Sequence, residues 1–169
     1  MRVQDAAEQA HQRLGISSQQ PQPPAQSLLH QWQQAVSDSA DSPAFTCLGQ
    51  TLTYTEMDQK SDALAASLYN RFDLRAGDRI AVQLPNLLQY PMVVIAAWKL
   101  GLVIVNTNPM YTHRELVHQF NDSGARAVLV LDQFYDTLTQ ALPETGVEHV
   151  VVTRAIDLLP QPKKGLLAV

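Results

Sequence analysis

The chain has 169 residues, of which 46% are hydrophobic and 17% charged, and this is enough apolar material for one domain with a buried core. Its formal net charge of −4, from 12 basic and 16 acidic residues, argues against a nucleic-acid-binding protein, which would carry a basic excess. Cys47 is the single cysteine, so no intrachain disulfide can form and nothing demands an oxidising compartment. The first residues lack the apolar core of a signal peptide, and we expect a cytoplasmic protein.

The first 26 residues differ in composition from the rest. Residues 17–26, SSQQPQPPAQ, are rich in Gln and Pro and offer little apolar surface to bury, and the residues before them are only weakly amphipathic. We therefore predict a flexible tail over residues 1–26 and a folded α/β unit over residues 27–169. The folded unit should begin with a helix that places Leu28 and Trp32 on one face.

A short hairpin and a capped helix are expected next. Residues 44–48 and 51–54 flank Gly49-Gln50, a pattern typical of a β-hairpin. Thr53 and Glu56 have the spacing of a capping box, in which each side chain accepts a hydrogen bond from the other residue's backbone N–H. This predicts a helix that runs on to about Phe72.

Beyond residue 77 the sequence alternates between short apolar runs and helical periodicity. The runs IAVQL, LVIV, AVLVL and HVVV are almost continuously apolar, as in strands that are covered on both faces. Pro91 fits the first turn of a helix, Gly101 and Gly124 fit helix stops, and Thr112 with Glu115 makes a second capping box. The predicted strands are residues 80–84, 102–105, 127–131 and 149–153, and the predicted helices are residues 88–100, 112–123 and 132–142. This order predicts an α/β fold, a partial doubly wound parallel sheet with flanking helices.

The apolar stretch 84–105 raises the question of a membrane span. It is interrupted by Pro85 and Lys99 and it breaks at Gly101, whereas a spanning helix needs about 20 apolar residues in a row. A buried helix followed by a buried strand fits this stretch better.

No motif for catalysis or metal binding is complete. The seven glycines are too far apart for a Gly-rich nucleotide loop, and no G-x-S-x-G elbow is present. In HRELVH, His113 and His118 are five residues apart and so point about 140° apart on a helix, which does not fit a zinc helix. Glu115 is then a helix cap, and Cys47 is expected to be buried and inert. We assign no catalytic residue and no metal ligand.

The loop from Asn106 to Tyr111 is the candidate binding segment. It follows a predicted strand and precedes a capped helix, where α/β proteins place their ligand sites. We take Asn106, Asn108, Pro109 and Tyr111 as candidate substrate-binding residues. Ordinary turn chemistry also explains the segment, because Asn side chains bond to nearby backbone and Asn-Pro starts turns.

Several short segments have sequence patterns that are typical of one enzyme family. They are LTY (52–54), GDR (77–79), LPNLLQYP (84–91), NPMYT (108–112), REL (114–116) and NDSGA (121–125). Together they resemble the N-terminal region of bacterial long-chain fatty acyl-CoA ligases, members of the adenylate-forming superfamily. The resemblance covers about residues 28–155 and implies the N-terminal subdomain of the adenylate-forming enzyme fold.

The resemblance implies a two-step reaction in which a fatty acid attacks ATP and coenzyme A then displaces AMP, with Mg²⁺ beside the phosphates. It also implies that the family's phosphate loop, adenine and ribose motifs and catalytic lysine follow later in a longer enzyme. Lys163 and Lys164 do not form that phosphate loop. We therefore expect this chain to be an N-terminal piece that is inactive alone and binds ATP, Mg²⁺ or coenzyme A weakly. Peripheral membrane contact and a homodimer are compatible with this expectation.

Two other functions stay open at this point. The chain is also compatible with another adenylate-forming enzyme, such as an aryl or medium-chain acyl-CoA ligase or an adenylation domain, because the acyl pocket is built mostly from later residues. A non-catalytic folding or dimerisation module is the alternative from a different class. A stand-alone nucleotide-binding domain is disfavoured by the absent glycine loop.

Overall fold

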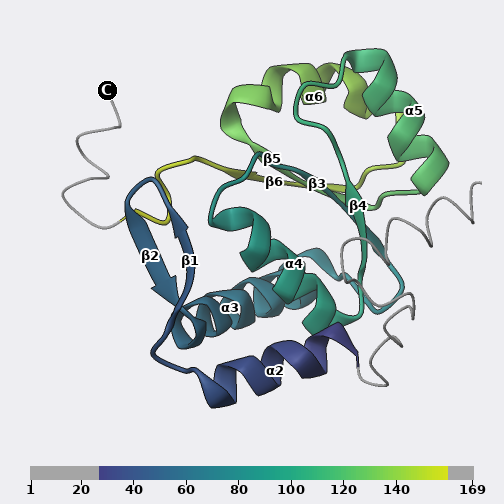
Figure 1. Ribbon diagram of the computed structural model, residues 1–169. Helices are drawn as coiled ribbons and strands as arrows, with labels where there is room; N and C mark the ends of the chain where they lie inside the picture. The colour runs from purple at the N-terminus through teal and green to yellow at the C-terminus, as the bar shows by residue number, and fades with distance from the viewer. Residues whose placement is uncertain (1–26, 160–169) are drawn as a thin grey trace, which may run out of the picture.

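The computed structural model describes residues 27–159, so the predicted tail over residues 1–26 lies outside the described residues, as do residues 160–169. A four-stranded parallel sheet with the order β4-β3-β5-β6 forms its centre (Figure 1). Its strands are β3 (Arg79–Gln83), β4 (Val103–Asn106), β5 (Ala127–Leu131) and β6 (His149–Thr153). The chain moves from β3 to one edge and then crosses back over β3 to reach β5. The predicted partial doubly wound sheet is thus confirmed.

Helices cover both faces of this sheet. Below it in Figure 1 lie α3 (Tyr54–Phe72) and α4 (Gln89–Leu100), and above it lie α5 (His113–Ser123) and α6 (Tyr135–Ala141). Successive side chains of a strand point to opposite faces, so Ile80 and Val82 pack against α3 and α4, whereas Ala81 packs against α5 and α6. All five residues of β5 are buried, as expected for a central strand with helices on both sides.

A third apolar cluster joins the N-terminal elements to α4. It lies between α2 (Leu28–Asp38), the hairpin of β1 (Pro43–Cys47) and β2 (Gln50–Thr53), and the helices α3 and α4, and its buried members include Trp32, Met57 and Ile95. None of the helices within residues 27–159 is long and apolar enough to cross a membrane. The apolar stretch 84–105 is instead divided between α4 and β4.

The predicted helix caps are confirmed. Thr53 and Glu56 exchange the two hydrogen bonds of a capping box at the start of α3, at 2.9 and 3.2 Å. Thr112 and Glu115 do the same for α5, and Thr112 N donates to Glu115 Oε2 at 2.8 Å. Gly101 ends α4 in the left-handed conformation, with φ of 69°, where glycine carries no steric penalty.

Two predicted boundaries are wrong. The hairpin turn consists of Leu48 and Gly49, both with positive φ, rather than Gly49 and Gln50, because a two-residue turn that follows the twist of its strands needs positive φ at both central positions. The helix predicted over residues 132–142 does not begin at Asp132. That residue starts a 3-10 turn (Asp132–Phe134), and α6 itself begins at Tyr135.

The three N-terminal helices are joined at Asp58 of α3, which binds Trp32 of α2 and Lys99 of α4, whose side chain is 14% exposed. Lys99 Nζ on α4 donates to Asp58 Oδ1 at 2.7 Å and to Asp62 Oδ1 at 2.6 Å, both on α3. Asp58 Oδ1 also accepts a hydrogen bond from Trp32 Nε1 on α2 at 2.7 Å. The Asp58 carboxylate therefore accepts hydrogen bonds from polar groups of two neighbouring helices. Its loss would leave Trp32 Nε1 and Lys99 Nζ without this acceptor.

An arginine forms the corresponding junction at the amino edge of the sheet. Arg126, directly before β5, donates through Nη1 to Asp78 Oδ2 at 3.0 Å and through Nε to Glu148 Oε2 at 2.7 Å. Asp78 lies just before β3 and Glu148 just before β6. Asp78 Oδ2 also accepts from the backbone N–H of Arg75 at 2.7 Å. That backbone hydrogen bond, together with the Arg126 guanidinium, outweighs partial burial and holds the pKa of Asp78 below its ordinary value.

We predict that Asp58→Ala lowers the free energy of unfolding by about 1–3 kcal/mol, because it deprives Trp32 Nε1 and Lys99 of their shared acceptor. Asp62→Ala is the matched control: its side chain is 63% exposed and, among the described residues, hydrogen-bonds only to Lys99, so its loss should cost under about 1 kcal/mol. Urea unfolding of the two variants measures both values. Equal losses would show that the contact with Trp32 does not contribute.

We predict that Asp78 accounts for part of the acid sensitivity of the fold. Because its pKa is lower in the folded than in the unfolded state, its contribution to stability is present above the ordinary pKa near 3.8 and is lost as the pH falls below it. Asp78→Asn should therefore be less stable than the wild type at pH 7, and the difference should narrow toward pH 3. Asp41→Asn, at an exposed carboxylate without a side-chain contact in the described residues, should change stability little at either pH.

Candidate functional site

The candidate loop leaves the carboxyl end of β4, at one edge of the sheet. Asn106 is the last residue of β4, and its Oδ1 accepts a hydrogen bond from the Tyr90 hydroxyl of α4 at 2.9 Å. Its backbone carbonyl accepts from Gln119 Nε2 of α5 at 3.0 Å. Helices from both faces of the sheet thus hold this residue, and its side chain remains exposed to solvent.

The rest of the loop is a tight turn. Tyr111 N donates to the Asn108 carbonyl at 3.1 Å, and Met110 N donates to Asn108 Oδ1 at 3.0 Å. Pro109 occupies the second turn position, which its fixed φ favours. Met110, at the tip, is 77% exposed. The turn chemistry weighed from the sequence is therefore present at Asn108 and Pro109.

The four candidate residues lie together, but their side chains do not all point one way. Tyr111 is half-buried and packs against the apolar cluster beneath α5 and α6, so its ring belongs to the core. Asn106 lies on the opposite face of the sheet, next to Tyr90. Asn108 uses its amide oxygen within the turn. The exposed polar surface of the loop therefore centres on Asn106.

Gln83 is a residue of this region that the sequence analysis missed. It ends β3, is fully buried, and donates through Nε2 to the Pro109 carbonyl at 3.3 Å, which ties the loop to the neighbouring strand. Its Oε1 is buried and has no hydrogen-bond partner among the described residues. A buried amide usually satisfies both of its polar atoms. The sequence feature that could have identified Gln83 is its position as a single polar residue inside the apolar run IAVQL.

A second ligand position of doubly wound sheets, where the strand order reverses, is crossed by a later segment of this chain. That position lies at the carboxyl ends of β3 and β5. Residues 154–159, which follow β6, run past these ends toward the hairpin (Figure 1). Gln89 Nε2 of α4 donates to the Arg154 carbonyl at 2.7 Å, and Ala155 packs against the apolar cluster to which Leu84 and Leu131 belong.

The segment that crosses the strand ends is fixed by a local carboxylate. Asp157 accepts hydrogen bonds from Arg154 N at 2.8 Å and from Thr153 Oγ1 at 3.2 Å. Burial raises the pKa of Asp157, but these hydrogen bonds outweigh it and bring the pKa below its ordinary value. The turn at residues 154–157 is therefore held by a charged carboxylate at neutral pH. The loop after β4 lies at the same carboxyl edge of the sheet, but outside the part that residues 154–159 cross.

The histidine segment of α5 has a structural role. Glu115 caps the helix, and hydrogen bonds from Thr112 hold the pKa of Glu115 below its ordinary value. His113 Nε2 lies 2.8 Å from Glu144 Oε1, beyond α6. Within residues 27–159 there is no group of three or more His, Cys, Asp or Glu side chains that could hold a metal ion. Cys47 is half-buried, and its Sγ lies 3.5 Å from the Asn86 carbonyl.

Known proteins share both the sequence and the fold of this chain. Residues 32–168 match the family model of the AMP-binding enzymes. A long-chain-fatty-acid–CoA ligase of Escherichia coli O157:H7 is 42% identical over 142 residues, which are 84% of this chain and 25% of the relative. The corresponding ligase of Haemophilus influenzae is 43% identical over 142 residues, with the same coverage.

The fold is shared with solved structures of the same kind. The crystal structure of a long-chain-fatty-acid-CoA ligase from Archaeoglobus fulgidus superimposes with a TM-score of 0.73 at 28% identity, over 82% of this chain and 29% of that one. The chain thus spans about a quarter of the length of the curated relatives it matches. With its family match over most of its residues and its doubly wound sheet, the chain belongs to the AMP-binding enzyme family.

Proposed function

We propose that this chain forms part of a long-chain fatty acid–CoA ligase. Such an enzyme joins a fatty acid to coenzyme A at the expense of ATP, through an acyl-adenylate, and releases AMP and pyrophosphate. The observation that carries the proposal is the sequence identity to the bacterial ligases, which extends over most of the chain. The shared fold supports membership of the superfamily but does not identify the carboxylic acid substrate, because enzymes of one fold act on many different carboxylates.

The described residues do not fit the groups that such a ligase needs. Residues 27–159 contain no cluster that could hold Mg²⁺, and the sequence has no Gly-rich loop to surround the phosphates of ATP. We therefore propose that ATP, Mg²⁺ and coenzyme A bind chiefly to other parts of the enzyme. The 169-residue chain alone is then expected to bind none of them tightly and to be inactive.

We propose that the loop carrying Asn106, Asn108, Pro109 and Tyr111 borders the substrate in the enzyme. Support comes from its place at a strand's carboxyl end, outside the crossing of residues 154–159. The exposed Asn106 amide offers both a donor and an acceptor for a bound molecule. The buried contact of Gln83 to Pro109 fixes the turn in position, as binding groups require.

We also propose where the enzyme acts in the cell and that it forms a homodimer. A long-chain fatty acid partitions into lipid, which supports peripheral contact of a cytoplasmic ligase with a membrane surface. A homodimer is supported by the apolar outer strand β6, where Val152 is 46% exposed and the strand has a pairing partner on one side only among the described residues.

We predict that residues 32–159 of this chain can replace the aligned part of the Escherichia coli ligase. The chimera should form palmitoyl-CoA from palmitate, ATP and coenzyme A, because the two segments share a fold and much of their sequence. The 169-residue chain alone, assayed beside it, should form none. A folded chimera active on benzoate or octanoate but not on palmitate would contradict the assignment to long-chain fatty acids. Activity of the chain alone would show that catalytic residues lie within it.

We predict that Asn106→Ala in this chimera raises the KM of a substrate several-fold with little change in kcat, as expected when binding alone is lost. Tyr90→Phe is the matched control, because it removes the same hydrogen bond to Asn106 Oδ1 but leaves the amide in place. Steady-state kinetics of both variants separate the two roles. The same change in both would mean that Asn106 is structural and does not touch substrate.

A further inference from the structure

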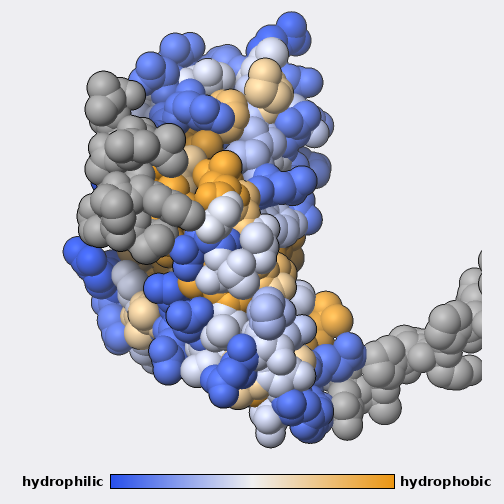
Figure 2. Space-filling model, turned by 60° about the vertical axis from the view of Figure 1, so that its left-hand side comes forward, coloured by the Kyte–Doolittle hydropathy of each residue, from blue (hydrophilic) through white to orange (hydrophobic). Residues whose placement is uncertain are grey.

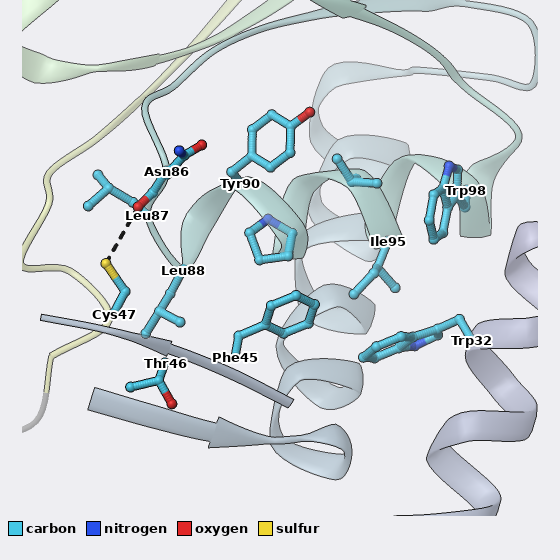
Figure 3. A pocket seen from close by; sticks show the side chains of 12 residues that line it. Trp32, Phe45, Thr46, Cys47, Asn86, Leu87, Leu88, Tyr90, Ile95 and Trp98 are labelled. Atoms are coloured by element: carbon cyan, nitrogen blue, oxygen red, sulfur yellow. Dashed lines mark hydrogen bonds between the residues drawn. The ribbon is translucent and has the colours of Figure 1, made fainter. Parts of the chain in front are cut away.

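An apolar groove lies between α2, the strand β1 and the helix α4. Its volume is about 460 Å³, and it is walled by Trp32 of α2 and Phe45 of β1 (Figure 3). Its floor is the outer face of α4, where Tyr90, Val94 and Trp98 lie half-buried. Figure 2 shows hydrophobic residues gathered between hydrophilic ones on the side of the molecule that it turns forward. The groove is as large as many small-molecule sites, which occupy about 300–1,000 Å³.

The floor of the groove is unusual for a helix with one side toward solvent. The opposite side of α4 packs under the sheet through Val93 and Ala97, and Ile95 packs beside Trp32. The groove side is apolar as well, whereas a surface helix normally presents a polar side to water. Contiguous apolar surface of this kind is typical of a ligand groove or a contact surface.

The chemistry of the lining favours a ligand that is hydrocarbon along its length. Trp32 Nε1 donates to Asp58 Oδ1 at 2.7 Å, and the Tyr90 hydroxyl donates to Asn106 Oδ1 at 2.9 Å, so both of these polar atoms are used within the protein. None of the described residues that line the groove is charged. Polar groups of a peptide or a nucleotide placed here would lose hydrogen bonds to water without replacement. A hydrocarbon chain has no such bonds to lose.

The two ends of the groove differ in polarity. Thr46 and the exposed Asn86 lie at one end, and Trp32 and Trp98 lie at the other (Figure 3). Between these ends the floor follows α4 from Leu88 to Trp98, and ten residues of α-helix extend about 15 Å. A narrow apolar slot with one polar end matches an amphiphile that has a single long tail. We propose that this groove binds the hydrocarbon tail of a fatty acid, with the carboxylate in water at the end formed by Thr46 and Asn86.

This inference goes beyond the proposed function, because it gives the chain an acyl site of its own, apart from the place where the acid reacts with ATP. The two regions are neighbours through one side chain. The ring of Tyr90 lines the groove, and its hydroxyl holds Asn106 of the loop after β4. A fatty acid in the groove therefore lies next to the loop that is proposed to border the substrate.

Tryptophan emission reports binding directly, because the sequence has two tryptophans and both line the groove. Laurate and decanoate are added to the 169-residue chain below their micelle concentrations. Both should shift the emission to shorter wavelength and saturate at one molecule per chain. Each methylene buried in the groove adds to the affinity, so laurate should bind about ten-fold more tightly than decanoate.

Variants on the floor of the groove show where the fatty acid binds. Val94→Asp places a charge in the path of the tail and should weaken laurate binding at least about ten-fold. Val103→Asp is the matched control, because it makes the same change at a valine of β4 that is 47% exposed and does not line the groove. Val94→Phe fills the groove without adding a charge and should also weaken binding. Far-UV circular dichroism checks the fold, and Val94→Phe decides if Val94→Asp does not fold.

Three results would overturn the proposal: no saturable response of the wild type to laurate, equal weakening by Val94→Asp and Val103→Asp, or binding to phosphatidylcholine vesicles without a response to laurate. An emission that changes with protein concentration alone would also overturn it, because a second copy would then cover the groove. A chimera active on palmitate beside a chain that binds no laurate would refute the groove site alone. Laurate binding by the chain beside an inactive folded chimera would support the groove site and refute the proposed function.

Discussion

The guanidinium of Arg126 is the interaction on which the arrangement of the sheet depends. It bridges Asp78, just before β3, and Glu148, just before β6, and it also donates to the Asp73 carbonyl at the end of α3 at 2.9 Å. Three parts of the chain that are far apart in sequence, residues 73–78, Arg126 and Glu148, thus meet at one side chain. Strand register in a parallel sheet decides which residues face which helix layer, and a slip by one residue would reverse both faces. The contacts of Arg126 lie where that register begins.

The two ends of the sheet are organised by different chemistry. The amino edge is held by charges, which explains the Gly77-Asp78-Arg79 segment as a turn and an anchor for β3. The carboxyl edge, where α/β proteins bind ligands, is crossed by residues 154–159 through the bond from Gln89 to Arg154 and the packing of Ala155. The position at the strand reversal is therefore crossed by this protein's own chain, and the loop after β4 lies outside that crossing with the Asn106 amide exposed.

The N-terminal elements extend the molecule beyond its sheet. Lys99, Asp58 and Trp32 join α4, α3 and α2 through one shared carboxylate, and the hairpin packs beside them. Together they build the walls of the apolar groove over α4. The groove is thus a consequence of how α2 is anchored, because Trp32 bonds through its ring nitrogen to Asp58 while the ring lies toward Phe45, with the two centroids 6.3 Å apart.

The sequence by itself determined the fold class, the order of the elements and their caps, because these depend on local periodicity and on residues a few positions apart. The capping boxes at Thr53 and Thr112 and the glycine stop at Gly101 needed no tertiary information. The turn at Leu48 and Gly49 escaped prediction because a leucine with positive φ is imposed by the pairing of β1 with β2. Sequence spacing pointed to the loop from Asn106 to Tyr111, but only the tertiary structure revealed its anchors Gln83, Tyr90 and Gln119. Likewise, the contacts of Arg126 and the crossing at residues 154–159 join residues that are brought together only when the sheet forms.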